Sequence, residues 1–324
     1  MLFVAPPRWF AGALVRSSLG AIALGALLTA GACRVSSHPT EPYEPPPAAR
    51  VPANWEAVLA APVEVEVQTV VSARWEAARK GLVNLRHPTA REAKLKNEPV
   101  PIVLPVGVIQ HPEAGDFIVG TGVDTALAQG ARDGAIRGLM RAAIKTIEPL
   151  ESLADIVARY ELSVQGVLLT HTHFDHVLGL PDLPPETPIY VGPGELRDRR
   201  KFNGLQRRTT KQLLDGRDPI REIDLDRSIA LDPFDAVVDL LGDGSIWGIV
   251  CEGHTKGSMA WLVNAAEGPA LFVGDTSHTR WGWEHGVEPG KFTGDQKLNA
   301  QSLAQLRAFV RRYPQTKVYL GHEL

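Results

Sequence analysis

The stretch "HTHFDH", from His171 to His176, holds three histidines and one aspartate within six residues. It follows the apolar run "GVLLT", which has the form of a buried strand. Side chains alternate sides along an extended segment, so His171 and His173 point the same way. A turn then brings Asp175 and His176 to the other side of the loop. Imidazoles and carboxylates are metal ligands, and two such pairs suit two ions rather than one.

The alternative is a solvated polar loop with histidines placed by chance, and the rest of the chain argues against it. Three later apolar runs also end in a ligand type: "GIVCEGH" ends at His254, "ALFVGD" ends at Asp275 and "KVYLGH" ends at His322. Any one of these alone would be weak evidence. Because open α/β sheets place their sites at strand ends, the whole set of five histidines and two aspartates predicts one metal centre.

The elements that must position these residues are predicted as one α/β domain over residues 53–324. A hairpin is predicted over 99–122 and helices over 150–162 and 298–313, the first with one face formed by Leu150, Leu153, Ile156 and Val157. Further short apolar runs predict strands, bounded by Gly, Pro or Asp, over 164–170, 188–192, 245–251, 258–263, 270–275 and 316–320. Strands that are apolar on both faces, mixed with helices, indicate packed α/β layers.

The amino-acid composition indicates a globular protein and gives no support to several other classes of protein. The chain has 324 residues, of which 44% are hydrophobic and 22% charged, so a sizeable core is expected. The net charge of -3 gives no reason to expect a nucleic-acid partner. The two cysteines, Cys33 and Cys251, exclude a disulfide framework, and Cys251 is interpreted as a small buried hydrophobe.

The first 32 residues have the pattern of a signal peptide, with Arg8 and Arg16 before a short apolar run. The run ends in "LTAGAC", which resembles a bacterial lipobox and implies a lipid anchor at Cys33. Cleavage of an ordinary secretory signal at "AGA" is the alternative. Arg34 after the cysteine implies the outer membrane in a Gram-negative cell, and otherwise we expect a periplasmic or secreted protein. Residues 33–52, rich in proline, serine and charge, are predicted as a flexible tether.

The H-x-H-x-D-H string, the G-H-T loop, the single aspartate and the terminal G-H resemble, in this order, the metallo-β-lactamase superfamily of metal-dependent hydrolases. The resemblance runs from about Pro99 to the C-terminus. It implies an αββα sandwich of two mixed sheets flanked by helices. It also implies a dinuclear site, with one ion held by His171, His173 and His254, the other by Asp175, His176 and His322, and Asp275 bridging both. Zinc is the expected metal, and iron or manganese accepts the same ligands.

A bridging aspartate separates this chain from the true β-lactamases of that fold. The strings over 100–124 and 239–263 are similar to the N-acyl homoserine lactonase-like branch, in which His111 belongs to the hairpin and is not a ligand. The chain departs from the branch at Glu252, where the family usually has proline. It also departs at His278, where the lactonases carry a tyrosine.

The resemblance and the two-ion site imply hydrolysis of a small-molecule lactone or ester through a metal-bridging hydroxide. Asp175 and His278 are the expected catalytic residues. His278 would donate to the developing oxyanion or carry a proton to the leaving group, or else it only shapes the loop. Thioester hydrolysis of the glyoxalase II type and phosphodiester hydrolysis are alternatives. A surface lipoprotein that is merely stabilised by metals is the non-enzymatic alternative.

Two further stretches bear on the substrate. Trp281, Trp283 and His285 follow the bridging aspartate and would either wall an acyl pocket or pack in the core. A basic insert could meet anionic lipid, an anionic substrate or RNA, although a solvated, mobile segment is the favoured interpretation. The basic residues of this insert are Arg197, Arg199, Arg200, Lys201, Arg207, Arg208 and Lys211.

Overall fold

The structure is a computed structural model that describes residues 34–48, 51–130, 136, 147–199 and 203–324. The predicted signal peptide over 1–32, the anchor residue Cys33 and the basic residues Arg200 and Lys201 lie outside these ranges. Export and lipidation therefore stay predictions, which a Cys33→Ser variant tests by its distribution between membrane and soluble fractions. Among the described residues, no helix has both the length and the apolar character to span a membrane.

The described residues form two mixed β-sheets, as the resemblance to the metallo-β-lactamase superfamily implied. The larger sheet has the strand order β1-β8-β7-β6-β4-β3-β2-β5 and the smaller has the order β14-β13-β12-β11-β10-β9. The strands of the larger sheet are β1 (Thr40–Tyr43), β2 (Glu66–Ala78), β3 (Pro99–His111), β4 (Gly115–Val119), β5 (Glu148–Pro149), β6 (Val164–Leu168), β7 (Ile189–Val191) and β8 (Ile220–Ile223). Those of the smaller sheet are β9 (Ile229–Leu231), β10 (Phe234–Asp239), β11 (Ile246–Val250), β12 (Met259–Val263), β13 (Ala270–Gly274) and β14 (Lys317–Leu320).

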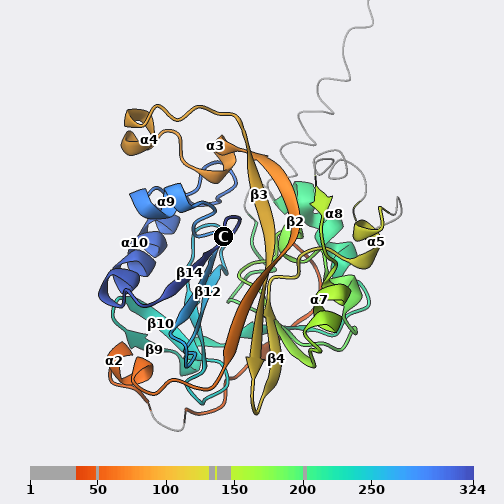
Figure 1. The fold of residues 1–324 in the computed structure, drawn as a ribbon, viewed down its shortest axis with the longest axis vertical. Coiled ribbons are helices and arrows are strands. Elements are labelled where there is room, and N and C mark those ends of the chain that lie inside the picture. The colour runs from red at the N-terminus through yellow and green to blue at the C-terminus, as the bar shows by residue number, and fades with distance from the viewer. Residues whose placement is uncertain (1–33, 49–50, 131–135, 137–146, 200–202) are drawn as a thin grey trace, which may run out of the picture.

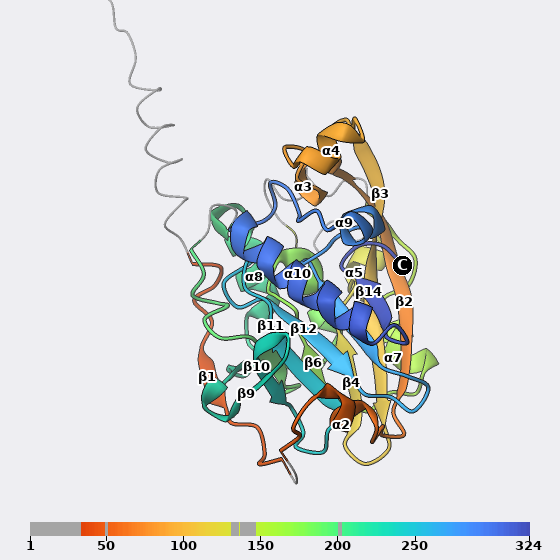
Figure 2. The ribbon, with the colours of Figure 1, turned by 90° about the vertical axis from the view of Figure 1, so that its left-hand side faces the viewer.

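Helices cover the outer faces of both sheets, which completes the expected αββα sandwich. Figure 1 shows α9 and α10 outside the smaller sheet and α7 and α8 outside the larger one. The helices are α2 (Trp55–Leu59), α3 (Arg79–Leu82), α4 (Pro88–Glu92), α5 (Thr125–Ala128), α7 (Leu153–Arg159), α8 (Asn203–Leu214), α9 (Arg280–His285) and α10 (Gln296–Arg312), with 3₁₀ turns η1 (Phe174–His176), η2 (Leu180–Asp182) and η3 (Leu225–Arg227). In the view of Figure 2, α10 lies obliquely across the front of the smaller sheet.

The predicted helices and hairpin are confirmed, with one error in detail. Strands β3 and β4 pair antiparallel, from Gly107 opposite Val119 to His111 opposite Gly115. Helix α7 begins after Ser152, whose hydroxyl accepts from the backbone N–H of Asp155 in a reciprocal capping box. Leu150, predicted on the buried face of that helix, precedes the cap and is 45% exposed.

Strand β2 was not predicted from the sequence, although it is one of the longest elements. It pairs antiparallel along the whole of β3, from Glu66 opposite Gln110 to Ala78 opposite Pro99. The stretch 63–71, "VEVEVQTVV", alternates apolar and polar residues as a half-buried strand does. This strand extends the larger sheet between β3 and β5 and, as described below, forms one wall of the site.

The segment predicted as a flexible tether is ordered in part. Val35 is fully buried, and its backbone N–H donates to the Asp198 carbonyl oxygen at 3.0 Å. Strand β1 pairs parallel with β8, with Thr40 opposite Ile220. Its sequence, "TEPY", contains a proline, which is tolerated because β1 lies at the edge of the sheet. The sequence gives no local signal for a pairing across 180 residues.

The core lies between the layers. Ile109, Leu168 and Trp261 are fully buried in the cluster shared by the two sheets, where Phe117 and Phe272 also pack. Burying each such side chain contributes about 1.5–3 kcal/mol. Cys251 is buried in the cluster beneath α10, and burial raises the pKa of its thiol to about 12. Its interpretation as a small buried hydrophobe is confirmed.

Candidate metal centre

Three ligand candidates meet because of the direction of their strands. Strand β11 is antiparallel to β12, β12 is antiparallel to β13, and β13 is parallel to β14. Strands β11, β13 and β14 therefore run the same way and end at one edge of the smaller sheet. His254, Asp275 and His322 follow these three ends. The loop from His171 to His176 leaves β6 of the larger sheet and meets them between the sheets.

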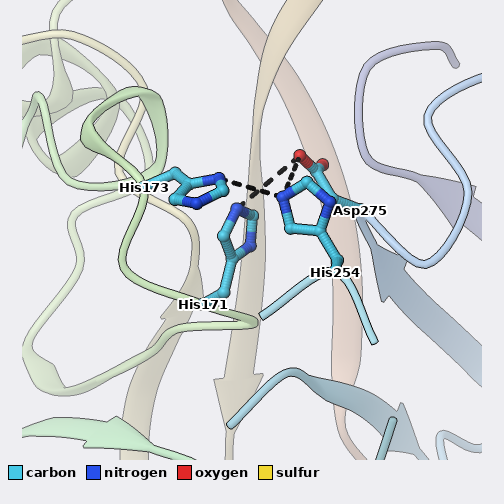
Figure 3. A group of neighbouring side chains, drawn as sticks. All are labelled: His171, His173, His254 and Asp275. Carbon is cyan, nitrogen blue, oxygen red and sulfur yellow. Dashed lines mark hydrogen bonds and ion pairs between the residues drawn. The ribbon is translucent and has the colours of Figure 1, made fainter. Parts of the chain in front are cut away.

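The first group consists of His171, His173, His254 and Asp275, whose ligand atoms all lie within 4.8 Å of one another. His254 Nε2 lies 2.9 Å from His173 Nδ1 and 3.3 Å from Asp275 Oδ2. His171 Nε2 lies 3.6 Å from the same carboxylate oxygen. Figure 3 shows the four side chains converging, with His173 and Asp275 reaching in from opposite sides. This is the set predicted for one ion together with its bridge.

The second group consists of Asp175, His176 and His322. His176 Nε2 lies 3.4 Å and His322 Nε2 lies 3.3 Å from Asp275 Oδ1, and His322 Nε2 lies 3.5 Å from Asp175 Oδ2. Asp275 thus turns its Oδ2 to the first group and its Oδ1 to the second. A carboxylate with this division is able to bridge two cations.

Three buried atoms at this centre have no hydrogen-bond partner: His171 Nε2, His176 Nε2 and Asp275 Oδ1. A buried polar atom without a partner is costly, and natural folds retain few of them. Bound cations would satisfy all three atoms at once, because each faces the common centre of the two groups. The residues present therefore fit the predicted pair of metal ions.

The outer nitrogens of three histidines are held by the protein. His322 Nδ1 lies 3.0 Å from the Val103 carbonyl oxygen, to which it donates, so its Nε2 faces the centre. His171 Nδ1 lies 3.2 Å from Thr170 Oγ1, and His254 Nδ1 lies 3.3 Å from Thr293 Oγ1. Contacts of this kind fix the ring orientation and tautomer of metal-binding histidines.

The electrostatics leave the first group with neutral imidazoles. Burial lowers the pKa of His173 to about 4, and burial is also the main reason that the pKa values of His171 and His254 lie well below their ordinary range. These rings are uncharged at pH 7 and keep the lone pairs that a metal ion needs.

His322 behaves differently. Burial lowers its pKa, but the carboxylates of Asp275 and Asp175 outweigh burial and raise the pKa to about 9. Burial also raises the pKa of Asp275, yet the surrounding histidines, led by His278, hold it well below its usual range. The centre therefore attracts positive charge, and in the metal-free protein His322 carries it as a proton.

Two glycines of the predicted motifs are needed for close approach. A Cβ at Gly321 would lie 2.3 Å from Asp275 Oδ1. Gly253 has a φ of 148°, and a Cβ there would lie 2.2 Å from the backbone nitrogen of Asn299. The glycine that precedes each of His254 and His322 thus lets the ligand loop pack against the centre or against α10.

His278 lies beside this centre rather than beneath the tryptophans. It is 1% exposed, its Nδ1 lies 3.2 Å from the Leu82 carbonyl oxygen, and its Nε2 lies 3.0 Å from Asp275 Oδ2. Because a carbonyl only accepts, Nδ1 carries a hydrogen. The other ring nitrogen, Nε2, is therefore the one that faces Asp275 and the centre. His278, Asp275 and His322 form a third group of possible ligands.

A cavity of about 270 Å³ opens onto the centre. His173, Asp175, His254, Asp275 and His322 line it on one side. Apolar side chains make up most of the remaining wall: Trp75, Ala77, Leu82, Ile102, Phe174 and Phe292. The cavity is therefore a largely apolar chamber with the ligand groups at one side.

The aromatic side chains that wall the cavity were not predicted from the sequence. Trp75 comes from the unpredicted strand β2 and makes an edge-to-face contact with Phe174 at 5.9 Å. The expected wall residues lie elsewhere, because Trp281 and Trp283 pack against the apolar clusters on either side of α9. His285 stacks on Trp281 at 4.4 Å. Core packing, the alternative stated for these tryptophans, is the arrangement observed.

None of the described basic residues of the insert lines the cavity, which the insert reaches through Gln206. Arg197 forms an ion pair with Glu222, and Arg199, Arg208 and Lys211 are exposed. Part of the insert is not a mobile loop, since α8 buries Leu213 and Leu214 in the core. Arg207 is half-buried, and the other described cationic side chains of the insert are exposed.

The comparisons with known proteins agree with this geometry. The family model of the metallo-beta-lactamase superfamily matches residues 105–322. A cytochrome P450 monooxygenase, mpaDE, of Penicillium brevicompactum is 31% identical over 128 residues, which is 36% of this chain and 14% of that protein. A hydroxyacylglutathione hydrolase of Hahella chejuensis is 29% identical over 169 residues, 52% of this chain and 51% of that protein. The chain thus spans only part of the curated relatives that it matches.

Solved structures of lactonases share the fold. An N-acyl homoserine lactone hydrolase with the product N-hexanoyl-L-homoserine at its catalytic metal centre superposes with a TM-score of 0.58 at 17% identity, over 82% of this chain and 95% of that one. AidC, a dizinc quorum-quenching lactonase, superposes with a TM-score of 0.53 at 11% identity, over 81% and 89% of the two chains. At these identities the likeness establishes the fold alone.

Proposed function

The chain belongs to the metallo-beta-lactamase superfamily, and from this premise we propose that it is a dinuclear metal-dependent hydrolase that opens a lactone or ester with an apolar acyl group. One observation carries the proposal. Asp275 turns one oxygen to each of two ligand groups, and both groups border an apolar cavity. A site that only stabilised the fold would need neither a shared carboxylate nor such a chamber.

Two divalent cations held there, zinc by preference, would acidify a water molecule and polarise the substrate carbonyl. The neutral imidazoles of His171, His173 and His254 would hold one cation. Asp175, His176 and His322 would hold the other. Asp175 also lines the cavity, and its carboxylate accepts the proton lost by the attacking water and returns it to the leaving oxygen.

The walls of the cavity support a neutral, apolar acyl group. Among the described residues that line it there is no lysine or arginine, so a phosphodiester or another anion would find no cation there apart from the metals. Ile102, 4% exposed, and Leu82, 2% exposed, face the cavity from β3 and α3. Such walls gain free energy by burying a hydrocarbon chain, at about 25 cal/mol for each Å² removed from water.

Thioester hydrolysis is the second candidate, and the hydroxyacylglutathione hydrolase relative is the observation in its favour. The two reactions share the attack on a carbonyl carbon and differ in the leaving group. A thioester with a charged glutathione moiety would need a polar or cationic binding surface. The described walls of the cavity, which are mostly apolar, favour the lactone or ester.

The test is turnover of a series of neutral lactones and linear esters of increasing acyl length, beside one glutathione thioester and one phosphodiester. We expect chelator-sensitive hydrolysis of the first two classes, with kcat/KM rising with acyl length. Ile102→Phe, which fills the cavity, should reduce turnover of long-chain substrates and spare short ones. A higher kcat/KM for the thioester than for the lactones and esters would favour thioester hydrolysis instead. Hydrolysis that a chelator does not reduce would refute both candidate functions.

A further inference from the structure

One buried acid near the centre has no role in the chemistry described so far. Glu195 follows β7, is 0% exposed and belongs to neither ligand group. Its Oε1 accepts from the backbone N–H of Thr172 at 2.7 Å and from the Thr172 hydroxyl at 2.9 Å. Its Oε2 accepts from the Thr255 hydroxyl at 2.6 Å and from the backbone N–H of Gly257 at 3.1 Å.

The partners of Glu195 lie on two different ligand loops. Thr172 stands between His171 and His173 on the loop that leaves the larger sheet. Thr255 follows His254 on the loop that leaves the smaller sheet. Each carboxylate oxygen of Glu195 therefore accepts hydrogen bonds from one loop only. The carboxylate group links two loops whose histidines belong to the same ligand group.

The packing around Glu195 is as close as its hydrogen bonding. A Cβ at Gly257 would lie 2.6 Å from the Glu195 Cβ, so glycine at position 257 allows the loop to reach the carboxylate. Burial raises the pKa of Glu195, while the donors from Thr255 and Thr172 oppose that rise. A buried carboxylate is tolerated only when its oxygens are satisfied, and here both oxygens accept two hydrogen bonds.

We propose that Glu195 is a positioning residue of the metal centre, which sets the separation of the His171–His173 loop and the His254 loop for the binding of one cation. The ligand nitrogens of His173 and His254 lie 2.9 Å apart, a spacing that two ligands of one ion can share. Each loop extends from its own sheet, and the Glu195 carboxylate links them directly. This inference rests on the proposed metal-dependent function.

A second carboxylate offers a matched control. Asp182 also accepts hydrogen bonds from two segments, from the backbone N–H and hydroxyl of Thr125 and from the backbone N–H of Ala154. Neither segment carries a ligand candidate. Asp182→Asn therefore measures what the loss of such a link does to the fold alone.

The experiment compares Glu195→Gln with Asp182→Asn and wild type. Glutamine keeps the size of the side chain, but its amide nitrogen cannot accept from the donors of one loop. We expect Glu195→Gln to weaken zinc binding, measured by chelator competition, by about 10- to 100-fold, the range found for partners that orient ligands. The Co²⁺ absorption spectrum should change as well, because it reports the ligand geometry directly. Asp182→Asn should leave zinc affinity and spectrum as in wild type.

Thr255→Val provides the test if Glu195→Gln does not fold, since it removes a single donor and keeps the shape of the side chain. It should lower zinc affinity in the same direction and by less. Zinc affinity and Co²⁺ spectra equal to wild type in either folded variant would overturn the positioning role. If wild type itself binds no metal, the proposed function fails as well; if wild type binds two ions and only the variants are unaffected, the inference alone fails.

Discussion

Two buried histidines at different places in the sandwich have opposite surroundings. His111, at the tip of the β3–β4 hairpin, is 6% exposed and has partners on both nitrogens. Its Nδ1 accepts from the backbone N–H groups of Glu113 and Ala114, and its Nε2 lies 2.9 Å from Asp243 Oδ2. His176, in the ligand loop, is 8% exposed, and its buried Nε2 has no partner.

The difference separates a structural histidine from a candidate ligand. The fold is able to satisfy a buried imidazole fully, as His111 demonstrates, whereas His171 and His176 each keep a buried Nε2 without a partner. These unpartnered atoms coincide with the two ligand groups. The prediction that His111 is not a ligand agrees with this, since neither of its nitrogens is directed to the centre and it belongs to no described ligand group.

The largest effect is expected from a change at the shared carboxylate. Asp275→Ala should abolish hydrolysis and reduce bound metal below two ions per chain, because each ligand group loses an oxygen and the centre loses one of its two carboxylates. His111→Gln is the matched control and should retain both ions and full turnover, with a loss of unfolding free energy of about 1–3 kcal/mol from its broken hydrogen bonds. The two variants are compared with wild type by their metal content, turnover and thermal unfolding.

Two ions and full activity in Asp275→Ala would remove the bridging assignment. Loss of metal in His111→Gln would contradict the distinction between a structural histidine and a ligand, since it would mean that the hairpin histidine also supports the centre.

A smaller effect is expected at His278, which resembles His111 in having protein partners on both nitrogens but contacts Asp275. His278→Ala should lower kcat by about 10- to 100-fold with both ions retained, because Asp275 loses a neighbour that fixes its orientation. A direct donor to the developing oxyanion would be worth more, roughly 10²- to 10³-fold. Turnover and metal content on an ester or lactone substrate distinguish the two roles.

His278→Tyr places the residue of the resembling lactonases at this position and should recover part of the activity if the site needs a hydrogen-bond donor. A loss of less than about fivefold in His278→Ala, with both ions bound, would show that His278 only shapes its loop.

The ligand candidates could be predicted from the sequence because their signal is local. Each follows the end of a strand, and the four ligand candidates within the six residues from His171 to His176 identify the loop by their spacing alone. The layers could be predicted for a similar reason, since β11, β12 and β13 are continuous apolar runs. The ligand candidates that follow a strand can therefore be predicted from the local sequence, without knowledge of the neighbouring strands.

The supporting residues could not be predicted, because their roles depend on pairings between distant segments. Glu195 lies in "GPGELRD", which has the composition of an exposed turn, and only the docking of two loops makes it a buried acceptor. Trp75 faces the cavity because β2 pairs with β3. The period-two alternation of apolar and polar residues would have predicted the strand. The sequence does not indicate which face of that strand borders the site.

The smallest effect concerns the stability of the metal-free protein as pH changes, and it sharpens the contrast between the two kinds of histidine. Burial lowers the pKa of His173 to about 4, below the ordinary value of about 6.5, so the unfolded chain binds this proton more readily. Stability from this source is present above pH 6.5 and is lost as pH falls towards 4. The pKa of His322 shifts the opposite way, to about 9, so its contribution to stability is present below pH 6.5 and is lost as pH rises through 9.

We therefore expect the urea midpoint of the metal-free protein to be highest near pH 6.5. His322→Gln should flatten the alkaline side and keep the acid side, and added zinc should flatten the alkaline side of wild type, because a histidine that binds metal is neutral. An alkaline decline that persists unchanged in His322→Gln would mean that His322 does not carry the proton of the metal-free centre.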